Sequence, residues 1–248
     1  MLDIRDVSHE YGKRNVLNTL SLKATTGVVA LVGVNGAGKS TLLSIAGGAL
    51  KPKNGRVTVD DADVYRIKSR RTALRKLSIM PQRFSFLPRF RVGEFVEYIA
   101  YMKGLSWKGA RTAADQSLEL VGLQSRKMSR MGSLSGGMLR RVALAQAITT
   151  KPEVLILDEP TTGLDPEQRA GVRDLIKTVS ADRVVLLSSH VMEDIETVAE
   201  RAVILHRGDF VFDGTLPQLK SLAPDSEAPD AAEAAFLKII KSTPEAVQ

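Results

Sequence analysis

The chain of 248 residues is 44% hydrophobic and 25% charged, an ordinary balance for a globular protein, so fibrous and disordered classes are excluded. It contains no cysteine, which excludes disulfides and thiolate metal sites. Its longest uncharged stretch, residues 24–38, is shorter than the roughly 20 apolar residues of a membrane-spanning helix, and the charged start MLDIRDVSHE does not look like a secretion signal. We therefore expect a cytoplasmic protein.

The net charge of +7 is concentrated in residues 51–91, where 12 Lys and Arg stand against 3 Asp and Glu. Such a segment is typical of proteins that bind nucleic acid, an anionic membrane face or an acidic partner. A solvated basic surface is the plain alternative.

Hydrophobic periodicity predicts strands first and then strands alternating with helices. In chain order we expect strands at 1–8, 15–24 and 28–32, a helix at 39–50, strands at 55–60 and 76–80, a helix-rich insert at 92–150, a strand at 154–157, a helix at 166–179, a strand at 183–188, a helix at 191–199, and strands at 202–205 and 209–212. This alternation indicates an α/β fold with a mostly parallel sheet covered by helices. After residue 223 the composition becomes that of a polar linker, followed by a short helix pattern that includes Phe236 and Leu237.

A glycine-rich phosphate loop lies between the third strand and the first helix. Its residues are Gly33-Val34-Asn35-Gly36-Ala37-Gly38-Lys39-Ser40, which fit the pattern G-x-x-x-x-G-K-[ST]. Glycines let successive backbone N–H groups converge on phosphates at a helix N-terminus. Lys39 would reach the β- and γ-phosphates, and Ser40 would bind Mg²⁺.

Two carboxylates follow the apolar strand at 154–157. Carboxylates at the carboxyl end of a sheet strand face the crevice in which open α/β sheets bind their ligands. Asp158 would hold the metal, and Glu159 would polarise a water aimed at the γ-phosphate. The acidic strand end alone is only moderately specific, but its pairing with the phosphate loop is strong.

Three further motifs accompany these two: Leu134-Ser135-Gly136-Gly137-Met138 before a basic helix, Gln82 after a strand, and His190 after a strand. Together with Asp158-Glu159-Pro160 and Gly163-Leu164-Asp165 they resemble, in the right order, the ATP-binding subunit of ABC transporters. The resemblance covers residues 1 to about 220. It implies a P-loop NTPase with an N-terminal antiparallel β subdomain and a helical subdomain, at about 92–150, that carries the signature motif; residues 221–248 would be a linker and a C-terminal helical extension.

The resemblance also implies ATP and Mg²⁺ as cofactors and assigns roles to individual residues. Glu159 would be the catalytic base and His190 the switch histidine. The metal would be held by Ser40, Gln82 and Asp158. ATP would contact Tyr11 through its adenine, the loop residues Gly33, Val34, Asn35, Gly36, Ala37, Gly38, Lys39, Ser40 and Thr41, and Gln82, with Ser135, Gly136, Gly137 and Asp165 contributed across a dimer. For Tyr11 simple packing is the alternative, and His190 could be a core histidine.

Met138 departs from the family's usual signature L-S-G-G-Q, so the glutamine amide is lost. Ser135, Gly136 and Gly137 still supply a hydroxyl and N–H donors at a helix start. With Arg140 and Arg141 following, the variant resembles the drug-resistance and polysaccharide or lipid-linked exporter branch, as does the apolar patch at 234–237 in the C-terminal extension.

The expected mechanism needs two copies. The signature residues lie about a hundred positions from the phosphate loop, and the resemblance implies that they complete the site of a second copy, or of a paralogous subunit. Two ATP molecules would close the pair, and hydrolysis would reopen it. Because ATP energy must be delivered somewhere, a separate transmembrane permease is implied, with the chain on the inner face of the membrane.

The segment from Arg83 to Arg91 interleaves aromatic and basic residues. We interpret it as part of a groove for a cytoplasmic helix of the permease. Packing of its phenylalanines under the helical insert is an equally weighted alternative.

Two other functions compete with transport. A soluble ABC-type ATPase acting on nucleic acid or ribosomes would use the basic segment, but such proteins usually carry paired cassettes or long coiled coils, so no nucleic acid partner is expected. A small-molecule kinase would leave the L-S-G-G motif and His190 unexplained. We expect export of a drug-like, peptide or lipid-like cargo.

Overall fold

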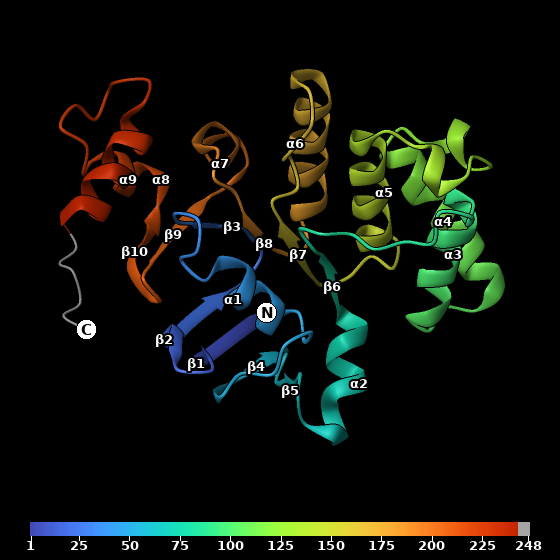
Figure 1. The fold of residues 1–248 in the computed structure, drawn as a ribbon, viewed down its shortest axis with the longest axis horizontal. Coiled ribbons are helices and arrows are strands. Elements are labelled where there is room, and N and C mark those ends of the chain that lie inside the picture. Colours follow the sequence, from blue (N-terminus) through green and yellow to red (C-terminus); the bar gives the residue numbers. More distant parts are fainter. Residues whose placement is uncertain (243–248) are drawn as a thin grey trace.

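The computed structural model describes residues 1–242 and contains a six-stranded core sheet (Figure 1). Its strands pair in the order β10 (Asp209–Thr215), β9 (Arg201–His206), β3 (Gly27–Val32), β8 (Val184–Ser188), β7 (Val154–Asp158) and β6 (Leu77–Met80). All neighbouring pairs are parallel except β10 with β9. The prediction of a mostly parallel core sheet is therefore confirmed.

A second, four-stranded sheet is formed by the N-terminal part of the chain. Its order is β2 (Arg14–Ala24), β1 (Leu2–Tyr11), β4 (Asn54–Val59) and β5 (Ala62–Asp63), and every pairing is antiparallel. The expected N-terminal antiparallel sheet is confirmed.

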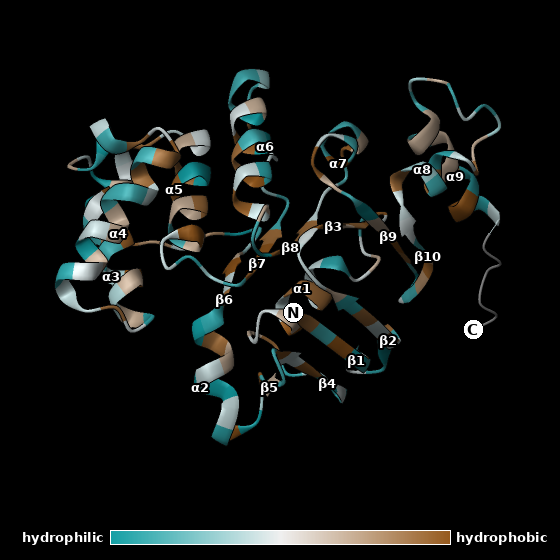
Figure 2. Cartoon of the chain, turned by 180° about the vertical axis from the view of Figure 1, so that it is seen from behind, coloured by the Kyte–Doolittle hydropathy of each residue, from teal (hydrophilic) through white to brown (hydrophobic). Residues whose placement is uncertain are grey.

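Helix α1 (Lys39–Ala46) lies between the two sheets and shares a hydrophobic core with both. Strand β3 contributes side chains to two hydrophobic cores, one on each face of the core sheet. Val29 and Leu31 pack towards α1, whereas Val28, Ala30 and Val32 pack into the core on the opposite face. The uninterrupted apolar run of β3 therefore reflects burial on both faces, and Figure 2 shows the same hydrophobic colouring on β3, β7 and β9.

Two groups of helices lie at the two ends of the core sheet, and other helices lie between them (Figure 1). The insert lies beyond β6 and consists of α3 (Val92–Met102), α4 (Trp107–Leu120), two short 3-10 turns (Gln124–Arg126 and Met131–Ser133) and α5 (Gly136–Ile148). The remaining helices are α6 (Pro166–Ser180), α7 (Met192–Val198), α8 (Leu216–Lys220) and α9 (Ala231–Ser242), the last two lying beyond β10.

The C-terminal helix packs on the rest of the chain. Ala231, Ala232 and Ala235 are buried, and α9 contacts α7 and α8. Within the described residues, α9 therefore covers apolar surface of its own chain. The predicted extension runs to residue 248, and its last six residues lie outside the described part.

The sequence predicted neither α8 nor a helix between β5 and β6. Helix α2 (Ile67–Lys76) has the sequence IKSRRTALRK, and only Ala73 in it is buried. Its ten residues include five Lys or Arg and only three apolar side chains, too few for the wide apolar stripe of a core-facing helix. The predicted helix at 39–50 is also shorter than expected, because the chain turns at Gly48 with a φ of 73°.

No helix within residues 1–242 has the length and apolar character that crossing a membrane requires.

Candidate active site

A glycine-rich turn connects β3 to α1, and its close packing explains two of its glycines. A Cβ atom at Gly33 would lie 2.3 Å from the carbonyl oxygen of Leu205, and Gly38 adopts a φ of 108° next to the backbone of Val16. Val34, Asn35, Gly36 and Ser40 are exposed on the outer side of the turn. The turn therefore presents an accessible backbone surface at the N-terminus of a helix, where anions are favoured.

Lys39 is the first residue of α1, and its side chain folds back over the turn. Its Nζ donates hydrogen bonds to the carbonyl oxygens of Gly33 at 2.6 Å and Val34 at 3.1 Å. Burial lowers the pKa of Lys39, and the nearby carboxylates of Glu159 and Asp158 oppose this shift. Phosphate oxygens would be stronger partners for this ammonium than the two carbonyls.

Strand β7 delivers Asp158 to the carboxyl edge of the core sheet, beside the end of β8. Asp158 and Ser188 are register partners, and the Ser188 hydroxyl donates to Asp158 Oδ1 at 2.6 Å. Asp158 is only 5% exposed. The hydroxyl leaves Oδ2 without a hydrogen-bond partner among residues 1–242, so one carboxylate oxygen is available to a ligand.

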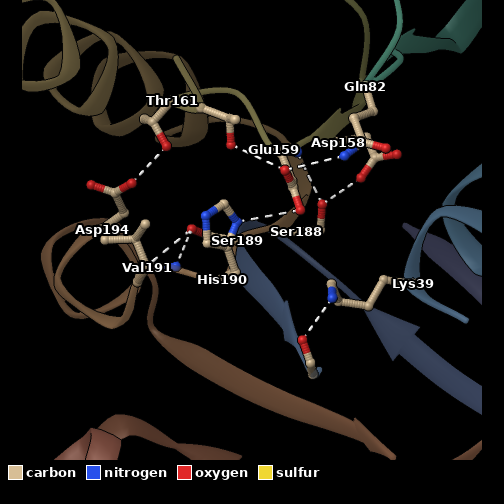
Figure 3. A network of polar contacts seen from close by, with 12 residues as sticks. Lys39, Gln82, Asp158, Glu159, Thr161, Ser188, Ser189, His190, Val191 and Asp194 are labelled. Atoms are coloured by element: carbon tan, nitrogen blue, oxygen red, sulfur yellow. Dashed lines mark hydrogen bonds and ion pairs between the residues drawn. The ribbon is translucent and has the colours of Figure 1, made fainter. Parts of the chain in front are cut away.

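Glu159 gathers three polar side chains around its carboxylate (Figure 3). Oε2 accepts from Gln82 Nε2 at 3.2 Å and from the Thr162 hydroxyl at 3.0 Å, while His190 Nδ1 lies 3.3 Å from Oε1. The Glu159 side chain is 10% exposed and that of His190 49%. The structure thus brings together Gln82, Glu159 and His190, which are far apart in the sequence, and leaves about half of the His190 side chain exposed.

The signature turn is organised by its own helix. Ser135 is the N-cap of α5, and its hydroxyl accepts from the Met138 N–H at 3.2 Å. Ser135 and Gly136 are exposed, and no hydrogen bond within residues 1–242 joins either of them to the phosphate loop. Asp165 is likewise exposed and caps α6, accepting from the Gln168 N–H at 2.8 Å.

Tyr11 lies at the end of β1 and is 54% exposed. Its ring meets that of His9 edge-on, with the centroids 4.9 Å apart. The ring is thus accessible for stacking, and its contact with adenine stays a prediction.

The expected metal ligands form a set of hard oxygen donors: the exposed Ser40 hydroxyl, the Gln82 amide oxygen and Asp158 Oδ2. Among the described residues no group of three or more His, Cys, Asp or Glu side chains could hold a metal by itself. Oxygen donors with a single carboxylate suit Mg²⁺, which usually binds through one or two carboxylates together with substrate phosphates.

Two residues of this network escaped sequence reasoning. Ser188 could have been found, because predicted parallel strands at 154–157 and 183–188 place their carboxyl ends at one edge. Thr162 gave no signal beyond its position in a turn after the acidic pair.

A phosphate loop between strand and helix, with a carboxylate at the end of another parallel strand of the same sheet, defines the class of P-loop NTPases. Within that class, residues 17–162 match the family described as ABC transporter. The chain is 33% identical over 223 residues to the linearmycin resistance ATP-binding protein LnrL of Bacillus subtilis (strain 168), covering 89% of this chain and 71% of LnrL. It is 34% identical over 215 residues to the Nod factor export ATP-binding protein I of Burkholderia orbicola (strain AU 1054), covering 86% of this chain and 70% of that protein.

A solved structure agrees. The ATP-binding cassette MJ0796, a dimer in a post-hydrolysis state bound to ADP and Pi, superposes with a TM-score of 0.80 and 25% identity, covering 87% of this chain and 99% of that one. The chain belongs to the ABC transporter family as its ATP-binding cassette, and it is an ABC ATPase. The resemblance found from the sequence motifs is confirmed.

Proposed function

We propose that this chain hydrolyses ATP as half of a pair, and that closure and reopening of the pair drive a separate transmembrane exporter. The observation that carries the proposal is the network at Glu159, where a buried carboxylate is held by Gln82 and approached by His190 on the sheet edge that also carries Asp158. A dimeric cassette bound to ADP and Pi is the structural relative that supports pairing.

In this proposal each side chain has a specific task. Lys39 leaves the loop carbonyls and neutralises the β- and γ-phosphates, and Glu159 orients the attacking water with His190 beside it. Phosphoryl transfer depends mainly on positioning and on charge neutralisation, so these preorganised groups would supply most of the rate. Mg²⁺, held by Ser40, Gln82 and Asp158, would neutralise phosphate charge when bound.

The second copy supplies what one chain lacks. Ser135 and Gly136 are exposed and Gly137 is half-buried at the N-terminus of α5, a position suited to a γ-phosphate, and no hydrogen bond within residues 1–242 joins Ser135 or Gly136 to the phosphate loop. We infer that they complete the site of the partner and that Asp165 lies at the same interface.

The permease would dock near the segment Arg83 to Arg91. Phe84, Phe86 and Phe90 are half-buried and pack against the main core, with Phe84 edge-on to Phe95 at 5.3 Å. The exposed residues of the segment are Arg83, Ser85, Leu87, Pro88, Arg89 and Arg91, with Leu87 61% exposed. We therefore refine the docking hypothesis: the phenylalanines support the segment from the core, while Leu87 and the three arginines meet the partner.

The exporter role rests on the relatives, one of which is described as a resistance protein and another as an export protein. The proposal places the chain on the inner face of the cell membrane with a drug-like, peptide or lipid-like cargo chosen by the permease. The division into a cassette at 1–220 and an extension at 221–248 belongs to the same proposal.

The substitution Glu159→Gln tests the assignment of the base. The neutral amide keeps the size of the side chain, so ATP binding should persist while phosphate release falls by about 100-fold or more. ATP should then convert the variant from monomer to dimer, as measured by light scattering after gel filtration. Phosphate release at the wild-type rate would contradict the proposed role of Glu159.

A further inference from the structure

Arg140 lies in the second turn of α5, five residues after the N-cap Ser135, and its guanidinium points towards the carboxyl edge of the core sheet. Nη1 donates to the carbonyl oxygen of Gln82 at 2.7 Å, and Nη2 donates to that of Asp158 at 2.7 Å. Nη2 also donates to the carbonyl of Glu159, and Nε approaches that of Pro160 at 3.4 Å. One side chain thus binds the backbones of two separate loops.

These partners are unusual for a half-buried arginine. Within residues 1–242 Arg140 forms no ion pair, so its hydrogen bonds go to backbone carbonyls, while the charges of Asp158 and Glu159 stabilise the guanidinium from beyond ion-pair distance. Burial lowers the pKa of Arg140, but a guanidinium titrates so far above neutrality that the charge remains. A planar fork with five N–H donors can bind several carbonyls at once, which a single ammonium cannot do in the same geometry.

The backbone that Arg140 binds is in a conformation that needs support. Glu159 has a φ of 51°, in the left-handed region that residues with a side chain rarely adopt. Its N–H donates to the Ser188 hydroxyl at 3.0 Å, while its carbonyl is bound by Arg140. The peptide groups on both sides of the Glu159 side chain are therefore fixed, one by β8 and the other by α5.

The Arg140 guanidinium also holds the backbone of Gln82, whose side chain binds the Glu159 carboxylate. Arg140 holds the Gln82 carbonyl, and the Gln82 side chain donates to Glu159 Oε2. Loss of the guanidinium would release both the carboxylate and the amide that orients it.

From this geometry we propose that Arg140 is a positioning residue for hydrolysis: it holds Glu159 and the Gln82 loop in their reactive arrangement from the helix that also carries the signature turn. The proposal deepens the function proposed above and rests on it. Arg140 touches neither water nor nucleotide in this role, so its effect falls on turnover rather than on binding.

The test compares Arg140→Met with a matched variant at the next position. Arg141 lies on the same helix and is also half-buried, but its Nη1 binds the Val121 carbonyl at 3.2 Å, inside the helical insert. We expect Arg140→Met to lower kcat by about tenfold or more and to change the KM for ATP less than twofold, whereas Arg141→Met should leave kcat within twofold of wild type. Arg140→Lys keeps the charge but loses the fork, so it should not restore kcat.

A second measurement separates positioning from simple damage. Because Arg140→Met leaves the phosphate loop and the signature turn intact, the variant should still form an ATP-dependent dimer by light scattering and should melt close to the temperature of Arg141→Met. Normal kcat in Arg140→Met, or loss of ATP-dependent dimerisation together with activity, would overturn the inference. Failure of Glu159→Gln to lose activity would instead overturn the proposed function, so the two failures are distinguishable.

Discussion

The acidic end of β7 and the N-terminal turn of α5 differ in how their own chain surrounds them. Asp158 and Glu159 are buried and bound by the side chains of Gln82, Ser188 and His190, from two other segments, whereas Ser135 and Gly136 are exposed and within residues 1–242 form hydrogen bonds in their own helix. In the function proposed above, the acidic end of β7 would be the hydrolytic half of a site. The exposed helix terminus of a second copy would be the other half, as a head-to-tail pair requires.

Among the substitutions that test the two regions, Lys39→Ala should have the largest effect, because it removes the cation of the phosphate loop and so weakens ATP binding. Hydrogen bonds to charged groups contribute about 1.5–3 kcal/mol, so ATP affinity should fall by roughly 10- to 150-fold. Calorimetric titration in the Glu159→Gln background would measure binding without turnover. Without nucleotide the melting temperature should not fall, because a buried charge rather than a packed apolar group is lost. Unchanged affinity would show that the turn does not bind phosphate.

The opposite half is tested by Gly136→Val. A Cβ at Gly136 meets no atom within 4 Å, so the monomer should fold and bind ATP as wild type does, while the added side chain obstructs the turn against a partner. We expect ATP-dependent dimerisation to be lost and hydrolysis to fall by about tenfold or more.

Gly171 offers the matched control for that variant. It is an exposed helical glycine in α6, and its Cβ would also meet nothing within 4 Å. Gly171→Val should therefore leave hydrolysis unchanged. Equal activity of the two variants would mean that the signature turn has no partner.

Some residues of the hydrolytic half could be predicted from a local sequence pattern, and others could not. The phosphate loop and the acidic strand end were found because each combines a fixed residue spacing with a flanking apolar strand, and both strands are buried on two faces. Gln82 and His190 have no such local signal. Their place beside Glu159 follows only from the order of strands in the sheet, so the family resemblance was needed to select them.

Helix α2 and Arg140 show what the sequence could not predict. Half of the residues of α2 are Lys or Arg and only Ala73 is buried, so the helix lacks the wide apolar stripe of a core-facing helix. Arg140 binds four backbone carbonyls. Because every residue has a backbone carbonyl, the sequence does not indicate which ones an arginine will bind. Both depend on tertiary packing between segments far apart in the chain.

The smallest of the expected effects concerns Ser188, whose hydroxyl donates a hydrogen bond to the Asp158 carboxylate. Ser188→Ala removes the hydroxyl that donates to Asp158 Oδ1, while the Glu159 N–H keeps the Ser188 carbonyl at 3.2 Å. Groups that orient a metal ligand typically contribute about 10- to 100-fold to metal affinity. We therefore expect the Mg²⁺ concentration that half-saturates hydrolysis to rise by about tenfold, with a smaller change in the maximal rate.

The neighbouring Ser189 provides the control, since it is equally buried but its hydroxyl accepts from the Val191 N–H at 3.0 Å instead. Ser189→Ala should leave the Mg²⁺ dependence unchanged. If Ser188→Ala lowered the maximal rate without moving the Mg²⁺ dependence, Ser188 would act on the Glu159 backbone, and Asp158 would not be the metal ligand. In that case the residues that orient the site would act on Glu159 alone, and not on both Asp158 and Glu159.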